Sequence, residues 1–365
     1  MSNIAVYTLS HTNDNYGQVL QYYATQKFLS QRGHHVTLLR FGYNNKCLSF
    51  LKKCIKRLLP KRKRILVGEE KIFHEWHEWS DYYSRLHPRH FEEFRRQYFD
   101  IKEYSAKVET ISNYDVFVTG SDQTWGGVYP NAFLVYANKT SKKIALAPST
   151  GGYKFTKSEL SQIHAYLSTY NLITVREESA FDMCKAAGIK NAKVILDPVF
   201  LLNADEYSQI AEEQEKKKPY LFLYLVGAET DLNVEQILSF ANSKKLNVKY
   251  VASQGRHDDY DKIWATVPEW ISLIKNADYV ITNSYHGAAF SIIYRKHFLV
   301  LPIKGVMERM NTRIVSTMRK LNLTNRIVSS GDMNVIFDDI DYSTAEEKIK
   351  ENICIIDNML KSEGL

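Results

Sequence analysis

The stretch ADYVITNSYHG, residues 277–287, decides the fold class of this chain. Its apolar run YVIT (279–282) has the composition of a strand, and the following AAFSIIY (288–294) predicts a helix. Open parallel α/β sheets bind their ligands where a strand, a tight turn and a helix N-terminus meet. Because the first N–H groups of a helix lack backbone partners and its dipole favours anions, we predict an anion site here. His286, placed in this turn, can exchange a proton near neutral pH and is a candidate acid.

Bulk composition limits the class of protein. A chain of 365 residues suggests two domains, and 44% hydrophobic residues are enough to fill two cores. No signal peptide is recognisable, and no segment has the apolar length of a membrane span, so we expect a cytoplasmic location. The four cysteines lack CxxC spacing, which indicates reduced thiols. We expect no metal and no bound cofactor.

A basic amphipathic segment interrupts the first half of the chain. Eight lysines and arginines lie within Lys52–Arg64, interleaved with leucine and isoleucine. Such a segment can lie on an anionic membrane surface, where each cation contributes about 1 kcal/mol. A solvated loop and an arm for nucleic acid are the alternatives. Since no recognised nucleic-acid module accompanies it, we favour peripheral attachment to the inner face of the plasma membrane and expect no nucleic acid.

The order of predicted elements indicates two α/β units. The opening strand (3–8), helix (17–31) and strand (36–41) form a mononucleotide-type half unit without a GxGxxG fingerprint. Further strands are predicted at 114–119, 143–147, 172–175, 194–196, 221–226, 248–252, 279–282 and 298–301, and helices at about 67–98, 157–169, 231–245, 311–321 and 343–361.

This pattern predicts an α/β fold of two Rossmann-like domains facing a central cleft. We assign residues 1–200 to an N-terminal domain, with the basic insertion at about 44–100. Residues 201–340 form the C-terminal domain, and residues 341–365 a C-terminal helix.

Five turns resemble, in order, those of the polysaccharide pyruvyl transferase family. They are NDNYGQVLQ (13–21), GSDQTW (120–125), VRE (175–177), LDP (196–198) and SYHG (284–287). The resemblance implies a GT-B-like fold. It also implies transfer of the pyruvyl group of phosphoenolpyruvate onto two sugar hydroxyls, giving a cyclic ketal and free phosphate. The acceptor would be a lipid-linked oligosaccharide, a precursor of a bacterial capsule or exopolysaccharide.

One position departs from the family pattern. Many relatives carry an arginine two residues before the histidine, where this chain has Ser284. Either another cation then holds the donor, or the donor is held differently. Among the cations we favour Arg313, because it opens a helix beyond the next strand. The other candidates are Arg295, Lys304 and Arg309.

The expected roles divide into three groups. His286 would protonate the enol carbon, and Asp122 or Asp14 would act as base toward the acceptor. The donor contacts are expected from Arg176, Ser284, Tyr285, Gly287 and Arg313. The acceptor contacts are expected from Asn15, Tyr16, Gln18, Ser121, Gln123 and Trp125.

Ordinary structural roles stay open for several of these residues. Arg176 could pair with Glu177 or Glu178 on the surface, the aspartates could be turn residues, and the aromatic rings could be core. Two other functions also stay open. The chain could be a GT-B glycosyltransferase that uses a nucleotide sugar, or a non-catalytic carbohydrate-binding protein of envelope assembly.

Overall fold

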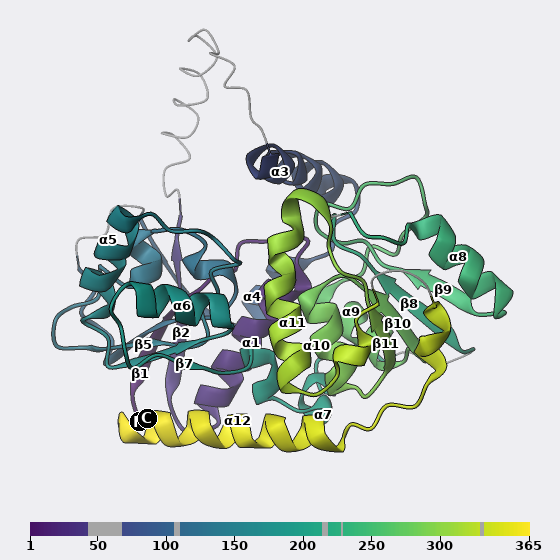
Figure 1. Cartoon of the computed structure of the whole chain (residues 1–365). Coiled ribbons are helices and arrows are strands. Elements are labelled where there is room, and N and C mark those ends of the chain that lie inside the picture. Colours follow the sequence, from purple (N-terminus) through teal and green to yellow (C-terminus); the bar gives the residue numbers. More distant parts are fainter. Residues whose placement is uncertain (43–67, 106–109, 214–217, 228, 329–331) are drawn as a thin grey trace, which may run out of the picture.

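Two parallel sheets organise the chain (Figure 1). The computed structural model describes residues 1–42, 68–105, 110–213, 218–227, 229–328 and 332–365. The first sheet has the order β3-β2-β1-β4-β5-β6-β7. Its strands are β1 (Asn3–Tyr7), β2 (His35–Phe41), β3 (Asp100–Tyr104), β4 (Val116–Thr119), β5 (Lys142–Ala145), β6 (Leu172–Val175) and β7 (Lys193–Val194). The strand order reverses between β1 and β4, so the carboxyl ends of these strands border the ligand-binding edge of such a sheet.

The second sheet has the order β11-β10-β8-β9, and all its described pairs are parallel. Its strands are β8 (Tyr220–Tyr224), β9 (Asn247–Tyr250), β10 (Tyr279–Thr282) and β11 (His297–Val300). Every residue of β8 is buried, as expected for a parallel strand covered on both faces. The prediction of two Rossmann-like α/β domains is confirmed by these two parallel sheets.

Helices cover both sheets. They are α1 (Tyr16–Ser30), α3 (Gly68–Leu86), α4 (Phe91–Tyr98), α5 (Lys157–Leu167), α6 (Glu178–Ala186), α7 (Ala204–Ser208), α8 (Val234–Ser243), α9 (Val267–Lys275), α10 (Tyr285–Ile293), α11 (Asn311–Lys320) and α12 (Ser343–Ser362). The sequence prediction missed β3, because its residues DIKEY are largely polar and exposed, which suits an edge strand. It also placed the start of α10 three residues late, so that His286 lies within the first helical turn.

An aromatic core joins the two domains. Tyr16 at the start of α1 stacks on Trp270 of α9, with ring centroids 5.2 Å apart. The Tyr16 hydroxyl donates to the carbonyl of Ala265 at 2.7 Å. The rings of Tyr224 and Phe290 also pack on this pair, at 5.9 Å from Tyr16 and 5.2 Å from Trp270. We call the boundary between the two domains the seam. Because these buried contacts cross the seam, they fix the two domains relative to each other.

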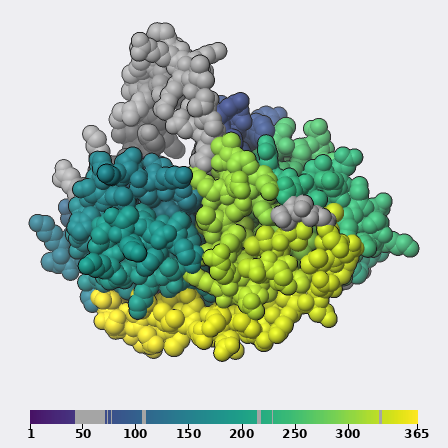
Figure 2. Space-filling view, in the orientation of Figure 1, coloured from purple at the N-terminus to yellow at the C-terminus, as the bar shows by residue number. Residues whose placement is uncertain are grey.

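Helix α12 crosses the seam as well, along one edge of both domains (Figures 1 and 2). On the N-terminal side, Asp357 pairs with Arg32 at 2.7 Å, and Asn352 accepts from the Leu196 amide at 2.9 Å. On the C-terminal side, Tyr342, just before the helix, donates to the Lys296 carbonyl at 2.6 Å. We keep the division near residue 200 as a proposal, since the two sheets lie on either side of it.

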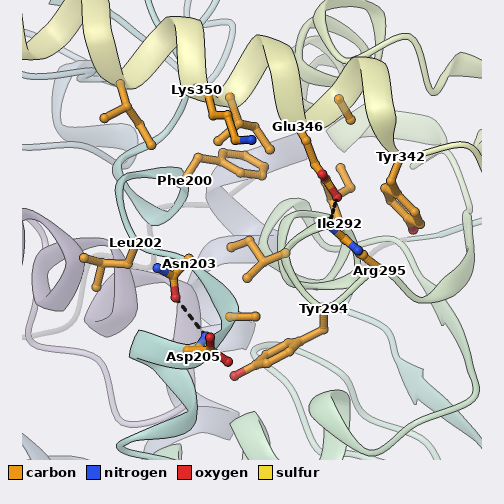
Figure 3. A pocket seen from close by; sticks show the side chains of 15 residues that line it. Phe200, Leu202, Asn203, Asp205, Ile292, Tyr294, Arg295, Tyr342, Glu346 and Lys350 are labelled. Carbon is orange, nitrogen blue, oxygen red and sulfur yellow. Dashed lines mark hydrogen bonds and ion pairs between the residues drawn. The ribbon is translucent and has the colours of Figure 1, made fainter.

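A cavity of about 710 Å³ opens between α12, α7 and the C-terminal end of α10 (Figure 3). Phe200, Ile292 and Ile353 give it an apolar lining, and the ion pair of Arg295 with Glu346 lies at its rim. His286 lies at the other end of α10, roughly 10 Å away at a helical rise of about 1.5 Å per residue. This cavity is therefore separate from the predicted anion site.

The basic segment Lys52–Arg64 lies outside the described residues, so its membrane role stays a prediction. Within the described part of the chain, no helix combines the length and the apolar content of a membrane span.

Candidate active site

His286 is held at the seam between the domains. It is the second residue of α10, and Ser284 caps this helix by accepting from the Gly287 amide at 3.4 Å. The imidazole packs directly on Gly17 of α1, where an added Cβ would lie 1.8 Å from Nδ1. Only 8% of the side chain is exposed, and Nε2 has no hydrogen-bond partner among the described residues. A buried, unpartnered nitrogen next to the opposite domain is an unusual and costly arrangement, which suggests a functional role.

The nearest carboxylate to this imidazole is Asp197, with Oδ2 lying 3.8 Å from Nε2. Asp197 follows β7 and is completely buried. It accepts from the Arg176 guanidinium at 2.5 Å, the Ser121 hydroxyl at 3.1 Å and the Val199 amide at 3.0 Å. Burial alone would raise the pKa of Asp197, but the charge of Arg176 and the His286 contact hold it well below its usual range. Asp197 is therefore an anion that binds Arg176 and lies beside the His286 ring.

Six side chains form what we call the seam cluster: His286, Asp197, Arg176, Glu177, Asp122 and Arg313. Arg176 lies at its centre. Its side chain is fully buried, with Tyr285 under the guanidinium at 4.7 Å, Glu177 at 3.7 Å and Asp122 at 3.8 Å. Burial lowers the pKa of Arg176, but Asp197, Tyr285 and these two carboxylates together raise it, so the group stays charged. Arg176 does pair with Glu177, as the structural alternative had it, but both side chains are buried, so the surface location is wrong. One arm of the fork is bound to Asp197, while Nε and the second terminal nitrogen have no hydrogen-bond partner in the described part of the chain.

Arg313 of α11 lies beside this centre. Its guanidinium is 3.9 Å from the Asp122 carboxylate, and 7% of the Arg313 side chain is exposed. With the Gln123 amide oxygen turned inward, Gln123 accepts from both terminal nitrogens of Arg313 at 3.2 and 3.3 Å. Burial and then repulsion by Arg176 lower the pKa of Arg313 to about 10. A bound anion would relieve this repulsion, so the pair of arginines favours an anionic ligand.

Four cations were candidates to replace the arginine that many relatives carry at position 284. The structure brings Arg313 to the cluster. The others are engaged elsewhere: Arg295 with Glu346, Lys304 with Asp231 and Arg309 with the Gly151 carbonyl.

Asp122 has a strained backbone. Its φ of 67° and ψ of −169° fall in a region that is normally occupied by glycine. Its carbonyl accepts from the amides of Thr124 and Ser149, both at 2.8 Å, which holds the turn after β4. Such a conformation costs on the order of 1–3 kcal/mol and persists where the surrounding structure requires it. Here it directs a carboxylate at both arginines.

The turn before α1 lies beside Gly17. Asp14 is buried, and its carboxylate accepts from the Thr12 hydroxyl at 2.7 Å. Asn15 caps α1 through the Gln18 amide and donates to Gln254 of the other domain at 3.1 Å. These residues, together with the half-buried side chain of Gln18, stay predictions for the acceptor side.

The structure corrects three aromatic assignments. Tyr16 and Trp125 were expected to contact the sugar, but both are completely buried; Trp125 stacks on Phe133 and donates to the Ala132 carbonyl at 3.1 Å. Tyr285 is covered by Arg176, and its hydroxyl bonds Thr317 at 3.1 Å, so the ring positions the arginine. All three are core residues, because their rings offer no free face to a ligand.

Three other predicted residues have structural contacts. Ser284 caps α10, and Ser121 donates to Asp197. A side chain at Gly287 would approach Thr282 to 2.4 Å, so this glycine lets α10 pack on β10. The sequence interpretation gave no role to Asp197, Glu177 or Gly17, although all three lie in the family-like turns. The signal that could have found Asp197 is its place directly after a strand on the ligand-binding edge.

Gly17→Ala should move the His286 imidazole without removing it. The added methyl group must displace the imidazole, because it would overlap Nδ1. A shift of about 1 Å in a catalytic group costs roughly 10²-fold, so we expect a comparable loss of kcat with little change in donor binding. Gly42→Ala, where a Cβ meets no atom within 4 Å, is the control. Full activity in the Gly17 variant would show that the imidazole position is not critical.

Comparison with known proteins now gives the cluster a context. A protein-family model described as "Polysaccharide pyruvyl transferase" matches residues 15–305. This range includes His286, Arg176, Asp197 and Asp122. Comparison with curated proteins finds no match. In the described residues, no group of three or more His, Cys, Asp or Glu side chains could hold a metal ion.

Solved structures similar to this chain are distant. The UDP-GlcNAc 2-epimerase of Methanocaldococcus jannaschii is 13% identical, with a TM-score of 0.43 over 96% of this chain and 91% of that one. UGT89C1 of Arabidopsis thaliana, complexed with UDP, is 13% identical, with a TM-score of 0.44 over 96% and 93%. The UDP-GlcNAc 2-epimerase of Neisseria meningitidis is 9% identical, with a TM-score of 0.45 over 99% and 100%. A likeness at this level says nothing about the substrate.

Proposed function

Because the chain belongs to the polysaccharide pyruvyl transferase family, we propose that it transfers the pyruvyl group of phosphoenolpyruvate onto a sugar of a surface-polysaccharide precursor. The product is a pyruvate ketal, and phosphate is released. The observation that supports this most is the buried seam cluster. Its imidazole, whose Nε2 has no hydrogen-bond partner among the described residues, shares Asp197 with Arg176, and Arg176 in turn shares Asp122 with Arg313. Such a site suits a small anionic enol that must receive a proton.

The donor carries a carboxylate and a phosphate, and it needs fixed cations. Arg313 is the more exposed of the two cations, and its Nε has no hydrogen-bond partner in the part of the chain that the structure describes. Arg176 is fully buried next to Asp122, which both arginines contact. Its pair with Asp197 keeps the Arg176 guanidinium in place. The N-terminus of α10, beside Ser284 and Gly287, adds the favourable end of a helix dipole.

Bond changes in the reaction balance as follows. His286 gives a proton to the methylene carbon, which becomes a methyl group, while one sugar hydroxyl adds to the neighbouring carbon and loses its proton to a base. The C–O bond to phosphate then breaks, and the second hydroxyl adds to the same carbon and loses its proton, which the departing phosphate takes up. Asp14 and Asp122 are the candidate bases. We favour Asp14, because Asp122 is engaged by both arginines at 3.8 and 3.9 Å.

Mass spectrometry of the acceptor tests the function directly. Lipid-linked precursors from the producing cells are incubated with the protein and phosphoenolpyruvate, and the mass gain of a pyruvate ketal is followed together with phosphate release. Matching amounts of ketal and phosphate are expected. Transfer of a sugar from UDP-sugars in parallel reactions, without ketal formation, would instead support the glycosyltransferase alternative.

Arg313→Ala should weaken the donor site. A hydrogen bond to a charged group contributes about 1.5–3 kcal/mol, so KM for phosphoenolpyruvate should rise roughly 10- to 100-fold. Arg313→Lys keeps the charge but loses the planar fork, and an intermediate value is expected. Initial rates at varied phosphoenolpyruvate measure the effect. Arg319→Ala, an arginine in the last turn of the same helix, is the control. An unchanged KM in the Arg313 variant would remove this residue from the donor site.

We further propose that the acceptor is lipid-linked and that Lys52–Arg64 brings the protein to the anionic inner face of the plasma membrane. This rests on the charge pattern of the segment and on the family's link to surface polysaccharides.

A further inference from the structure

Two adjoining cavities lie away from the seam cluster, between α3 and the loops that follow β8 and β9. One, of about 500 Å³, is bordered by Tyr83 of α3, by His87 just after this helix, and by residues 256–262 and Trp264. The other, of about 340 Å³, is bordered by Trp76 and Trp79 and shares Arg256 and His257 with the first. We call the two together the aromatic trough. Each has the volume of an ordinary ligand site.

Backbone geometry shows that the trough is a defined feature of the fold. A Cβ at Gly227 would lie 1.9 Å from the Gly255 carbonyl oxygen, and one at Gly255, whose φ is +68°, would lie 2.3 Å from the Trp76 ring. The two loops can therefore approach each other and α3 only because both residues are glycine. Asp258 fixes the rest of the loop by accepting from Tyr250 at 2.7 Å and from Arg256 at 2.8 Å.

Aromatic rings and carboxylates dominate the lining. The Trp264 ring stacks on His87 at 4.3 Å and on Tyr83 at 5.2 Å, and Trp79 packs on His257 at 4.2 Å. Tyr260 is 39% exposed. Sugar rings bind to such surfaces by their C–H faces, while carboxylates accept from their hydroxyls.

Charge in the trough favours a neutral ligand over a nucleotide. The cations Arg256 and Lys262 are both bound to Asp258, at 2.8 Å and 2.5 Å. Lys304, at the other end, pairs with Asp231 at 3.4 Å. The exposed acids Asp259 and Asp261 then add negative charge, which repels a diphosphate.

Direct contacts connect the trough to His286. Gln254, in the loop after β9, accepts from the Gly227 amide on its backbone carbonyl at 2.9 Å and from the Asn15 side-chain amide on its own Oε1 at 3.1 Å. Asn15 caps α1, and Gly17, two residues later, contacts the imidazole. The Asn15–Gln254 hydrogen bond thus places the start of α1, which contacts the imidazole, next to the loop that borders the trough.

We propose that the aromatic trough binds the non-reacting sugars of an oligosaccharide acceptor. This rests on the proposed function for the identity of the reaction, but the binding itself does not. The trough then selects for chain length: long acceptors gain its contacts, and single sugars do not.

Tyr260→Ala and Trp264→Ala test the proposal, with Tyr129→Ala, an exposed tyrosine in the N-terminal domain, as the control. The probes are ketal-free oligosaccharides from partial acid hydrolysis of the producing cell's surface polysaccharide, and methyl glycosides of its single sugars. An aromatic contact is worth roughly two- to tenfold in affinity, so KM for the oligosaccharides should rise by that factor, with kcat and KM for phosphoenolpyruvate constant. The methyl glycosides should show no change.

Titration calorimetry in a His286→Ala background measures binding without turnover. The oligosaccharides should bind, and each trough substitution should weaken them. Because Tyr260 is exposed, its substitution leaves the fold intact and the test does not depend on Trp264 alone. Equal affinities in all variants, or trough-dependent binding of UDP in place of oligosaccharides, would overturn the proposal. Trough-dependent binding without any ketal formation would overturn the proposed function and leave the trough as a saccharide site.

Discussion

His286→Ala should lower kcat by about 10²- to 10⁴-fold, the usual contribution of a positioned general acid. The reason is geometric: Nε2 is buried at the seam, without a hydrogen-bond partner among the described residues, and lies next to the arginine pair that would hold the donor. KM for phosphoenolpyruvate should change far less, because both guanidinium groups remain. Steady-state kinetics of phosphate release measures both parameters.

Controls separate proton donation from general disruption. His74→Ala removes an exposed histidine that pairs with Glu78 on α3 and should keep full activity. Imidazole added to His286→Ala should restore part of the rate, since the deleted side chain leaves room for it. In D₂O the wild-type product should carry one deuterium in the ketal methyl group. Near-native kcat in His286→Ala would remove the acid assignment.

The sequence predicted the fold well, for a physical reason. Buried parallel strands are apolar throughout, so the runs that became β8, β10 and β11 stand out from their polar turns. The exposed edge strand β3 has no such contrast, and the prediction missed it. The start of α10 was misplaced because Tyr285 and His286 gave no apolar helical periodicity, although Ser284 has the side chain of a good N-cap.

Assignments within the site were less complete. Strand ends indicated that Asp122 and Arg176 lie at the carboxyl edge of the first sheet and His286 at that of the second, because the carboxyl ends of parallel strands share one edge within a sheet. The structure brings these two edges together, with Arg313 beside them. Sequence position could not show that Arg176 is covered by Tyr285 and bound to Asp197, since this depends on packing between distant segments. For the same reason Trp125 looked like a sugar-binding ring, whereas it stacks on Phe133 in the core.

Asp197→Ala should be the most destabilising of these substitutions. It leaves the Arg176 guanidinium buried without its closest anion, and breaking a buried pair typically costs about 3–5 kcal/mol. Since a domain is stable by roughly 5–15 kcal/mol, the loss is a large part of the total. Denaturant unfolding measures it. The control is Asp357→Ala, which breaks a partly exposed pair with Arg32 of similar length and should cost only about 0–1 kcal/mol.

The pH dependence of this difference gives a second test. The pKa of Asp197 is lowered in the folded state, so its carboxylate stabilises the fold at pH values above the ordinary aspartate pKa of about 3.9. The stabilisation is lost as the pH falls below that value toward the folded pKa. The difference in unfolding free energy between wild type and Asp197→Ala should therefore be constant from about pH 5 upward and shrink below about pH 4. If Asp197→Ala costs no more than Asp357→Ala, or if the difference shows no change in acid, the buried pair does not anchor the site, and Arg176 must be held by Tyr285 and its other carboxylate neighbours.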